Sequence, residues 1–469
     1  MVRFVPLLLC LILIGVIIVG ETPTVQPSPT TATTAAGPLR VSSDNPRYFA
    51  TPDGRPLLLT GSHTWQNFQD TGYGDPPPVF DYPAYLDFLQ RNNHNFFRLW
   101  VWEQSRWSNE IVSDDYFSLP QPYQRAGSRL ALDGKPRFDL DRFDQSYFDR
   151  MRERVVAAGN RGMYVSVMLF DGWSIEACKG ELCDNNPWKG HPFNRANNVN
   201  GLDGDLNGDG SGEETQTLAA PDVTERQEAY VRKVIDTVGD LDNVLYEISN
   251  EGPPNSAPWQ YHMIEFIRAY ETSRGKVHPV GMTSNYPGDN NDLYTSPADW
   301  ISPNGDVDNP PVATGDKVVL SDTDHLCGLC GDSSWPWKSF TRGENPIYMD
   351  AYDGAYGIGG SMGDPTARSI RVNLGYVREY ATRMNLATAR PQPDLCSTGY
   401  CLANSDEYLV FSPSGEAGVR LNGATFAGQW LDPDNGMTFA IPGVHAGETV
   451  EFRAPFSGPA VLYLKKQPS

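Results

Sequence analysis

Positive charge is scarce in this sequence. It holds 37 Lys and Arg residues against 58 Asp and Glu residues, so its formal net charge is −21 at pH 7. Nucleic acids and anionic membrane surfaces attract basic proteins, and the acidic balance therefore argues against both as partners. The charge alone selects no substrate, because acidity is also common in exported enzymes.

Familiar catalytic signatures are missing as well. The sequence has no HExxH motif and no identifiable Ser or Cys triad, which leaves little support for a calcium-dependent protease. No Gly-rich phosphate turn follows the first expected strand, so a doubly wound nucleotide-binding sheet is disfavoured. We expect no organic cofactor.

Cysteine is rare, with seven residues in a chain of 469. Six of them fall in three close pairs, which predicts three short disulfides that pin loops in an exported protein. A redox dithiol or half a zinc site is the alternative for the CGLC segment, but no second CxxC and no nearby His pair supports zinc. The pairs are Cys178 with Cys183, Cys327 with Cys330, and Cys396 with Cys401.

The N-terminus carries an almost unbroken apolar run at 4–20, preceded by Arg3. This pattern predicts a secretory signal peptide, with an uncleaved anchor as the alternative. Residues 21–40 are rich in Thr and Pro and predict an extended linker. We therefore expect an extracellular protein, secreted or anchored at the cell surface. Any membrane contact is expected only through the apolar run at 4–20.

Residues 41–392 predict one α/β domain, a (β/α)8 TIM barrel. Short apolar runs without polar alternation are separated by helical stretches or long loops, as in buried parallel strands. Helices are expected at 82–92, 144–160, 223–238, 259–274 and 366–385, with Asp222 or Thr224 capping the third. The eight expected strands are 56–62, 95–102, 163–170, 244–249, 279–283, 299–302, 317–321 and 346–349.

A small antiparallel β-sandwich is expected at 402–469, after the Pro-rich boundary near 391–393. Turn signals separate short strands at 407–411, 418–421, 424–430, 437–441, 449–453 and 460–464. Such a domain could bind carbohydrate, but the favoured interpretation is a stabilising cap that packs against the barrel.

The segment NVLYEISNE, which ends in Asn250-Glu251, bears the clearest chemical signal. Side chains at the carboxyl ends of parallel strands face the ligand crevice. A carboxylic acid fixed there beside an amide suits a general acid/base for glycosidic-bond cleavage. The alternative is a surface Glu251 in a Pro-flanked loop. Glu247 lies on the same strand face but deeper, and is read as a buried residue that orients its neighbours.

These features resemble the (β/α)8 retaining glycoside hydrolases, the large cellulase and β-mannanase superfamily, over roughly residues 45–390. The resemblance implies that Glu251 is the acid/base, that Asn250 contacts a sugar 2-hydroxyl, and that Arg98 on the second strand orients the nucleophile. A barrel followed by a small β-sandwich further resembles the apiosidase-like proteins, whose C-terminal module is often labelled collagen-binding.

The chain departs from that superfamily at the nucleophile. A Glu is expected at the end of the seventh strand, whereas this sequence reads VLSDTDH there. Asp is a competent glycosyl nucleophile, though one methylene shorter. We rank Asp322 before Asp324, and Asp324 before Asp350, which becomes the candidate if the strand count is off by one. The alternative is that Asp322 and His325 only hydrogen-bond within a loop.

Flat side chains near strand ends are candidates for packing against sugar rings. Trp65 and Trp102 are preferred, His63 is a candidate hydroxyl ligand, and Trp173 and His325 complete the predicted substrate-binding set. Core or loop packing is the alternative for any single Trp. Further candidates are Trp100, Trp335 and Trp337.

The segment 203–214, DGDLNGDGSGEE, fits the calcium-loop pattern D-x-[DN]-x-[DN]-G-x5-E. Oxygen ligands with a Gly at the sharp turn suit Ca²⁺, so we expect one structural calcium site, with a solvated empty loop as the alternative. The flanks do not read as paired EF-hand helices. The expected ligands are Asp203, Asp205, Asn207, Asp209, Ser211 and Glu214.

Taken together, the sequence predicts an exported glycoside hydrolase that cleaves O-glycosidic bonds of a poly- or oligosaccharide with two carboxylates. The other functional class left open is a catalytically silent carbohydrate- or matrix-binding protein built on a barrel scaffold.

Overall fold

The computed structural model describes residues 37–108, 115–177, 186–354, 359–445 and 449–468. The predicted signal peptide, most of the predicted linker, and the Cys178 and Cys183 pair lie outside these residues. In the part of the chain that is described, no helix has both the length and the apolar character needed to cross a membrane.

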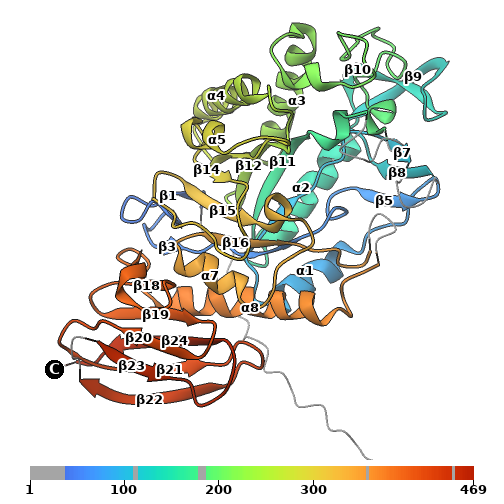
Figure 1. The fold of residues 1–469 in the computed structure, drawn as a ribbon. Coiled ribbons are helices and arrows are strands. Elements are labelled where there is room, and N and C mark those ends of the chain that lie inside the picture. The colour runs from blue at the N-terminus through green and yellow to red at the C-terminus, as the bar shows by residue number, and fades with distance from the viewer. Residues whose placement is uncertain (1–36, 109–114, 178–185, 355–358, 446–448, 469) are drawn as a thin grey trace, which may run out of the picture.

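Eight parallel strands form the central sheet of a barrel (Figure 1). Every one of them was predicted, and the order around the barrel follows the chain. Closure occurs where the first strand meets the second, with the Asn95 N–H donating to the Thr60 carbonyl. The strands are β4 (Gly61–His63), β6 (Phe96–Leu99), β11 (Tyr164–Asp171), β12 (Val244–Asn250), β13 (Val280–Thr283), β14 (Trp300–Ser302), β15 (Val318–Asp322) and β16 (Asn345–Met349).

The first barrel strand begins later than predicted. Residues 56–57 belong to β3 (Pro56–Leu57), which pairs with β2 (Phe49–Ala50) and, through it, with β1 (Arg40–Val41) in a separate small sheet. The expected hairpin therefore exists, and it takes up residues that were assigned to the barrel.

Five long helices surround the sheet as predicted: α1 (Tyr82–Arg91), α2 (Gln145–Gly159), α3 (Pro221–Val238), α4 (Ala257–Arg274) and α8 (Pro365–Arg383). The predicted cap of α3 was wrong. The helix starts at Pro221, whose fixed φ suits the first turn, and Ala220 precedes it without a side-chain cap. Three short helices, α5 (Asn291–Thr295), α6 (Thr323–Leu326) and α7 (Trp335–Thr341), lie in the second half of the barrel.

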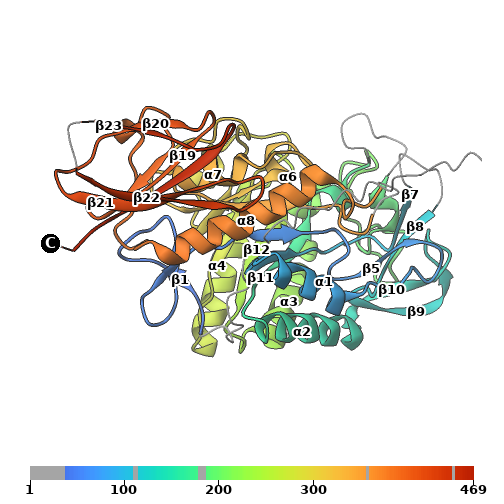
Figure 2. The ribbon, with the colours of Figure 1, turned by 90° about the horizontal axis from the view of Figure 1, so that it is seen from below.

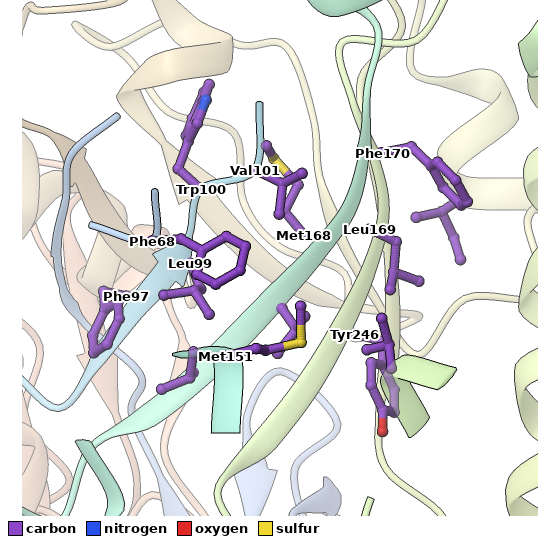
Figure 3. Close-up of a cluster of buried hydrophobic side chains, with 14 of the residues drawn as sticks. Phe68, Phe97, Leu99, Trp100, Val101, Met151, Met168, Leu169, Phe170 and Tyr246 are labelled. Atoms are coloured by element: carbon purple, nitrogen blue, oxygen red, sulfur yellow. The ribbon is translucent and has the colours of Figure 1, made fainter. Parts of the chain in front are cut away.

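The barrel strands are apolar because both of their faces are covered. Every residue of β11 and of β12 is buried. Figure 3 shows Leu99, Met168, Leu169 and Tyr246 among the buried side chains along β6, β11 and β12. This packing fixes the positions at which each strand emerges, and thereby the side chains that follow.

Elaborations leave the barrel after the first three strands. One three-stranded sheet joins β5 (Asp70–Tyr73), β7 (Arg106–Ser108) and β8 (Asp115–Leu119). A hairpin of β9 (Tyr123–Leu130) and β10 (Pro136–Phe143) follows. Between β11 and α3 the described chain holds only short turns, η1 (Trp173–Ile175), η2 (Pro187–Gly190) and η3 (Glu213–Gln216), in keeping with the long loop that was predicted.

The C-terminal region is the predicted pair of antiparallel sheets. The larger has the order β17-β18-β19-β24-β21-β22, and the smaller pairs β20 with β23. Their bounds are β17 (Arg390–Pro391), β18 (Cys401–Ala403), β19 (Glu407–Ser412), β20 (Glu416–Val419), β21 (Thr425–Leu431), β22 (Thr438–His445), β23 (Val450–Arg453) and β24 (Ala460–Lys466).

Helix α8 lies between the barrel and the sandwich (Figures 1 and 2). Its Tyr380 packs edge-on against Tyr463 of β24 at 5.6 Å and against Trp337 of α7 at the same separation. Gln429 of β21 donates to the Tyr380 hydroxyl at 2.6 Å. The predicted packing of the sandwich against the barrel is therefore confirmed.

The cysteine prediction was right for one pair and wrong for another. Cys327 and Cys330 form a disulfide. Cys396 and Cys401 are free, buried thiols. A hydrogen bond with Cys401 and a weaker one with Thr398 outweigh burial and lower the pKa of Cys396 to about 6. The predicted disulfide between these two cysteines is therefore not formed.

Candidate active site

Arg98 of β6 is the centre of a buried cluster at the carboxyl end of the barrel. Its Nε and Nη2 donate to the two carboxylate oxygens of Glu247 at 3.0 and 2.5 Å. Its Nη1 donates to Asp322 at 3.0 Å and to Asp324 at 2.8 Å. Nη2 also donates to Asn250 Oδ1 at 2.6 Å. One guanidinium therefore joins the second, fourth and seventh strands.

The strand register explains this convergence. Arg98 lies beside Ser166 of β11, and Ser166 lies beside Leu245 of β12. Glu247 is two residues further along β12, on the same face, so the long Arg98 side chain reaches it across β11. Glu247 is fully buried, as predicted for a residue that orients its neighbours.

The cluster holds fixed charges. Burial alone would lower the pKa of Arg98, but Glu247 and Asp322 raise it well above its ordinary value. Burial likewise would raise the pKa of Asp322, and the contacts with His63 and Arg98 instead hold it well below the ordinary value. Asp322 is therefore a carboxylate near neutral pH.

His63 of β4 faces Asp322. Its Nε2 lies 3.0 Å from Oδ1 and 2.9 Å from Oδ2 of that carboxylate. The ring is fully buried and stacks on Trp100 at 5.6 Å. Its Nδ1 has no hydrogen-bond partner among the described residues. This position suits a residue that holds Asp322 better than a ligand for a sugar hydroxyl.

His325 and Asn250 are locked to each other. The Ser302 hydroxyl of β14 contacts His325 Nδ1 at 2.7 Å, and His325 Nε2 lies 3.2 Å from Asn250 Oδ1. Burial and Arg98 lower the pKa of His325 to about 4, although Asp322 and Glu251 act against them. The ring is thus neutral near pH 7, with Nε2 as the donor to Asn250.

Glu251 follows β12 directly and is partly exposed. Its φ of +44° is left-handed, a strained conformation for a residue with a side chain. Gly172 packs against it so closely that a Cβ on Gly172 would lie 2.2 Å from the Glu251 carbonyl oxygen. The Gly172 N–H also donates to the Asn250 carbonyl at 2.7 Å. The ends of β11 and β12 together fix where the Glu251 side chain starts.

Asp350, the third nucleophile candidate, is bound elsewhere. Arg371 of α8 donates from Nε to Asp350 Oδ2 at 2.7 Å and from Nη2 to Oδ1 at 2.9 Å. The Tyr352 N–H also donates to this carboxylate at 2.9 Å. Asp350 thus joins the eighth strand to the helix that follows it.

The predicted aromatic residues separate into two groups, and Trp107, which was not predicted, joins the first of them. Trp102, Trp107 and Trp173 contact one another near the ends of the second and third strands, at 5.3 to 5.9 Å. Trp102 is buried and donates from Nε1 to the carbonyl of Trp65, which is also buried, whereas Trp173 is partly exposed. Trp335 and Trp337 belong to α7 and pack in other clusters, away from this edge.

Sequence reasoning missed an acidic pair beside the cluster. Asp171 ends β11, and its Oδ1 lies 3.4 Å from Asn250 Nδ2. Glu103 follows β6, accepts the Asp171 N–H at 2.8 Å and lies 3.3 Å from His191 Nε2. The signal that could have found both residues is the one used for Glu251, a carboxylate just after a barrel strand.

The predicted calcium loop is built around Asp205. Its Oδ1 accepts the N–H groups of Gly208 and Asp209, and its Oδ2 accepts the N–H of Gly210 at 2.9 Å. The Asn207 amide nitrogen bridges Asp209 and Glu214 at 2.9 and 2.6 Å. The prediction made Asp203 the first ligand of the loop. In the structure, the residue that accepts the backbone N–H groups of the turn is Asp205, two residues later.

A second group of potential metal ligands lies in the cluster itself. Within the described ranges, Asp322, Asp324 and His325 are the one set of three such side chains with ligating atoms within 4.8 Å of one another. Arg98 Nη1, however, already lies 3.0 Å from one carboxylate and 2.8 Å from the other. A guanidinium thus takes the place that a cation would occupy.

Comparison with solved structures identifies the architecture. A glycoside hydrolase family 5 protein from Bacteroides vulgatus ATCC 8482 is 14% identical, with a TM-score of 0.59 over 92% of this chain and 93% of that one. A protein described as a glycoside hydrolase, also 14% identical, has a TM-score of 0.58 over 95% of this chain and 99% of that one. At this identity the likeness establishes the fold. This chain has the fold of those hydrolases.

Two further comparisons add little. Residues 106–290 match a family model described as a domain of unknown function, DUF6298, which is less than half of the chain. No curated protein matches the sequence.

Proposed function

We propose that this protein is a glycoside hydrolase that cleaves O-glycosidic bonds of a poly- or oligosaccharide. The observation that carries the proposal is the position of Glu251. It follows the fourth barrel strand, next to Asn250, and Asn250 belongs to the same hydrogen-bonded cluster as the carboxylates of the seventh strand. The shared fold with glycoside hydrolases supports the same conclusion.

The proposed reaction uses two carboxyl groups and retains the anomeric configuration. Protonated Glu251 gives its proton to the leaving oxygen while a carboxylate from the end of β15 bonds to the anomeric carbon. Glu251 then removes a proton from the water that displaces this carboxylate. Arg98 keeps the β15 carboxylates ionised and in place, and Asn250, held by Arg98 and His325, faces the sugar 2-hydroxyl.

The decisive experiment is a glycan-panel assay of the wild type against Glu251→Gln. The substitution removes the proton donor and keeps the size of the side chain, so we expect hydrolysis to fall about 10²- to 10⁴-fold. Glu265→Gln on the exposed face of α4 is the matched control and should leave activity unchanged.

Equal hydrolysis by wild type and Glu251→Gln would contradict the assignment of Glu251. Binding of a glycan with no turnover in either protein would favour the alternative, a carbohydrate-binding protein on a barrel scaffold.

We also propose that segment 203–214 binds one calcium ion. Asp205, Asp209 and Glu214 place carboxylates around one turn, and the Asn207 amide lies where a cation would sit between two of them. An ion there would hold the loop between β11 and α3.

Calcium at a hundred times its Kd should raise the free energy of unfolding by about 2.7 kcal/mol. Thermal denaturation with calcium or with EGTA measures this. Asp205→Asn should abolish the difference, whereas exposed Asp44→Asn should keep it. A calcium response unchanged in Asp205→Asn would place the ion elsewhere.

Export is proposed on the disulfide between Cys327 and Cys330, because disulfides persist mainly in oxidising compartments. N-terminal sequencing of the protein recovered from culture medium tests this and shows whether residues 1–20 are removed. Recovery only from the cell interior, with the two thiols reduced, would contradict it.

A further inference from the structure

Two aspartates at the end of β15 compete for the second catalytic position. We infer that Asp324 attacks the anomeric carbon, and that Asp322 is a positioning residue that fixes Arg98 and the first turn of α6. This inference rests on the proposed hydrolase function. It reverses the order expected from the sequence, where Asp322 occupies the strand end.

The hydrogen-bonding capacity of Asp322 is taken up by the protein. Its Oδ1 accepts from His63 at 3.0 Å and from the Asp324 N–H at 3.1 Å. Its Oδ2 accepts from Arg98 at 3.0 Å and lies 2.9 Å from the same His63 nitrogen. Its side chain is only 1% exposed. Three donors thus hold this carboxylate from within the protein, and its burial leaves little access for a sugar carbon.

Asp322 also has a structural task. It is the N-cap of α6, where its side chain accepts the N–H of Asp324. Asp is among the residues preferred at this position because it satisfies an otherwise unpaired helix donor.

Asp324 is held by fewer contacts. Its Oδ2 accepts from Arg98 at 2.8 Å, and its Oδ1 accepts no hydrogen bond from any described residue. Its side chain is 6% exposed, and the residue as a whole is only partly buried. Arg98 thus holds one oxygen and leaves the other available for bond formation.

Asp324 is also connected to the end of β12 through His325. Its Oδ2 is 3.6 Å from His325 Nε2, and that nitrogen contacts Asn250, the residue before Glu251. The shortness of Asp is thereby offset, because the chain turns into α6 after Asp322 and brings a second carboxylate towards Asn250.

The chemistry balances without another reactant. Asp324 Oδ1 forms a bond to the anomeric carbon as the bond to the leaving oxygen breaks, and that oxygen takes the Glu251 proton. Water then bonds to the same carbon, its proton passes to Glu251, and the Asp324 ester bond breaks. Asp322 and Arg98 keep their charges throughout.

The direct test is covalent labelling of the wild-type protein. A panel of 2,4-dinitrophenyl 2-deoxy-2-fluoro-β-glycosides slows release of the glycosyl group, and fragmentation of the labelled peptide distinguishes residue 322 from residue 324. An adduct on Asp324 is the expected result. An adduct on Asp322 would overturn the inference and leave the hydrolase function intact.

Azide rescue provides the second readout, with 2,4-dinitrophenyl glycosides as substrates. Asp324→Ala should lose activity about 10³-fold or more, and azide should restore turnover with a glycosyl azide of opposite anomeric configuration. Asp322→Ala, and the gentler Asp322→Asn, should lose stability and gain nothing from azide. Rescue of Asp322→Ala but not of Asp324→Ala would reverse the roles.

The two levels of failure are separable. A wild type that hydrolyses its substrate with inversion has no glycosyl-enzyme, which overturns the inference while keeping the hydrolase function. A wild type with no turnover on any glycoside overturns both.

Discussion

The barrel buries carboxylates at both of its ends, and it treats them in opposite ways. At the carboxyl end, Asp322 is paired with Arg98 and His63, and its pKa is held far below the ordinary value. At the other end, Glu344 precedes β16 with a buried side chain, and its Oε2 has no hydrogen-bond partner among the described residues. Burial raises the pKa of Glu344 to about 8.

The two ends differ in charge state: Asp322 stays ionised beside Arg98, whereas Glu344 stays protonated and neutral near pH 7. A buried ion costs several kcal/mol of desolvation unless a partner compensates it. At the carboxyl end, Arg98 compensates three carboxylates at once. Glu344 has no such partner and avoids the desolvation penalty because it remains protonated. Buried groups that stay ionised despite desolvation are typical of catalytic sites, and the Arg98 cluster is such a group.

Removing Arg98 should have the largest effect. Arg98→Met leaves three buried carboxylates without their cation, so we expect a loss of about 3–5 kcal/mol in the free energy of unfolding and the loss of hydrolysis. Urea denaturation measures the first and turnover of aryl glycosides the second. Arg226→Met, at a more exposed ion pair with Asp141, is the control and should change stability little. Unchanged stability of Arg98→Met would mean that the carboxylates are not charged.

A pH-dependent effect is expected at the opposite end. The folded pKa of Glu344 is about 8 against an ordinary 4.5, so the folded state binds more protons between these values and stability falls as pH rises through them. Glu344→Gln removes this penalty. We expect the variant to match wild type near pH 4 and to exceed it by roughly 2–4 kcal/mol at pH 9. Denaturant melts at the two pH values measure this, and parallel curves would contradict a protonated Glu344.

The smallest effect should come from His63. His63→Gln keeps a hydrogen-bond donor but removes the imidazole ring, whose contact lowers the pKa of Asp322, so that pKa should rise towards its ordinary value. The stability contributed by Asp322 is present above its unfolded pKa and is lost as pH falls through its folded pKa. Acid unfolding of the variant should therefore begin at a higher pH, with a cost of about 1 kcal/mol at neutral pH. An unshifted acid midpoint would show that Arg98 alone holds Asp322.

The sequence predicted the eight strands well because each is a short apolar run that ends at a helix or loop. It also marked Glu251 as a candidate, since the position of a residue at a strand end follows from the chain alone, whereas Arg98 was a candidate through the resemblance to a known superfamily. The exact bounds of the strands were harder to predict. The start of β4 depended on pairing between β2 and β3, which takes up residues 56–57.

The sequence could not predict which side chains in the site contact one another. His63 meets Asp322 only because the first strand lies beside the eighth, and the eighth beside the seventh, after closure. The order of Asp322 and Asp324 depends on which of them caps α6, a matter of backbone angles and not of residue type. Cys396 and Cys401 have the spacing of a disulfide, and their geometry leaves them as thiols.

Helix α8 makes the barrel and the sandwich depend on each other. Its buried residues are shared between the barrel and the larger sheet of the sandwich, so neither domain has a finished surface without the other. A gene fragment that ended after the barrel would encode a chain with Tyr380 and Trp337 open to water. Barrel and sandwich are therefore expected to unfold together, and replacement of the sandwich would require matching changes in α8.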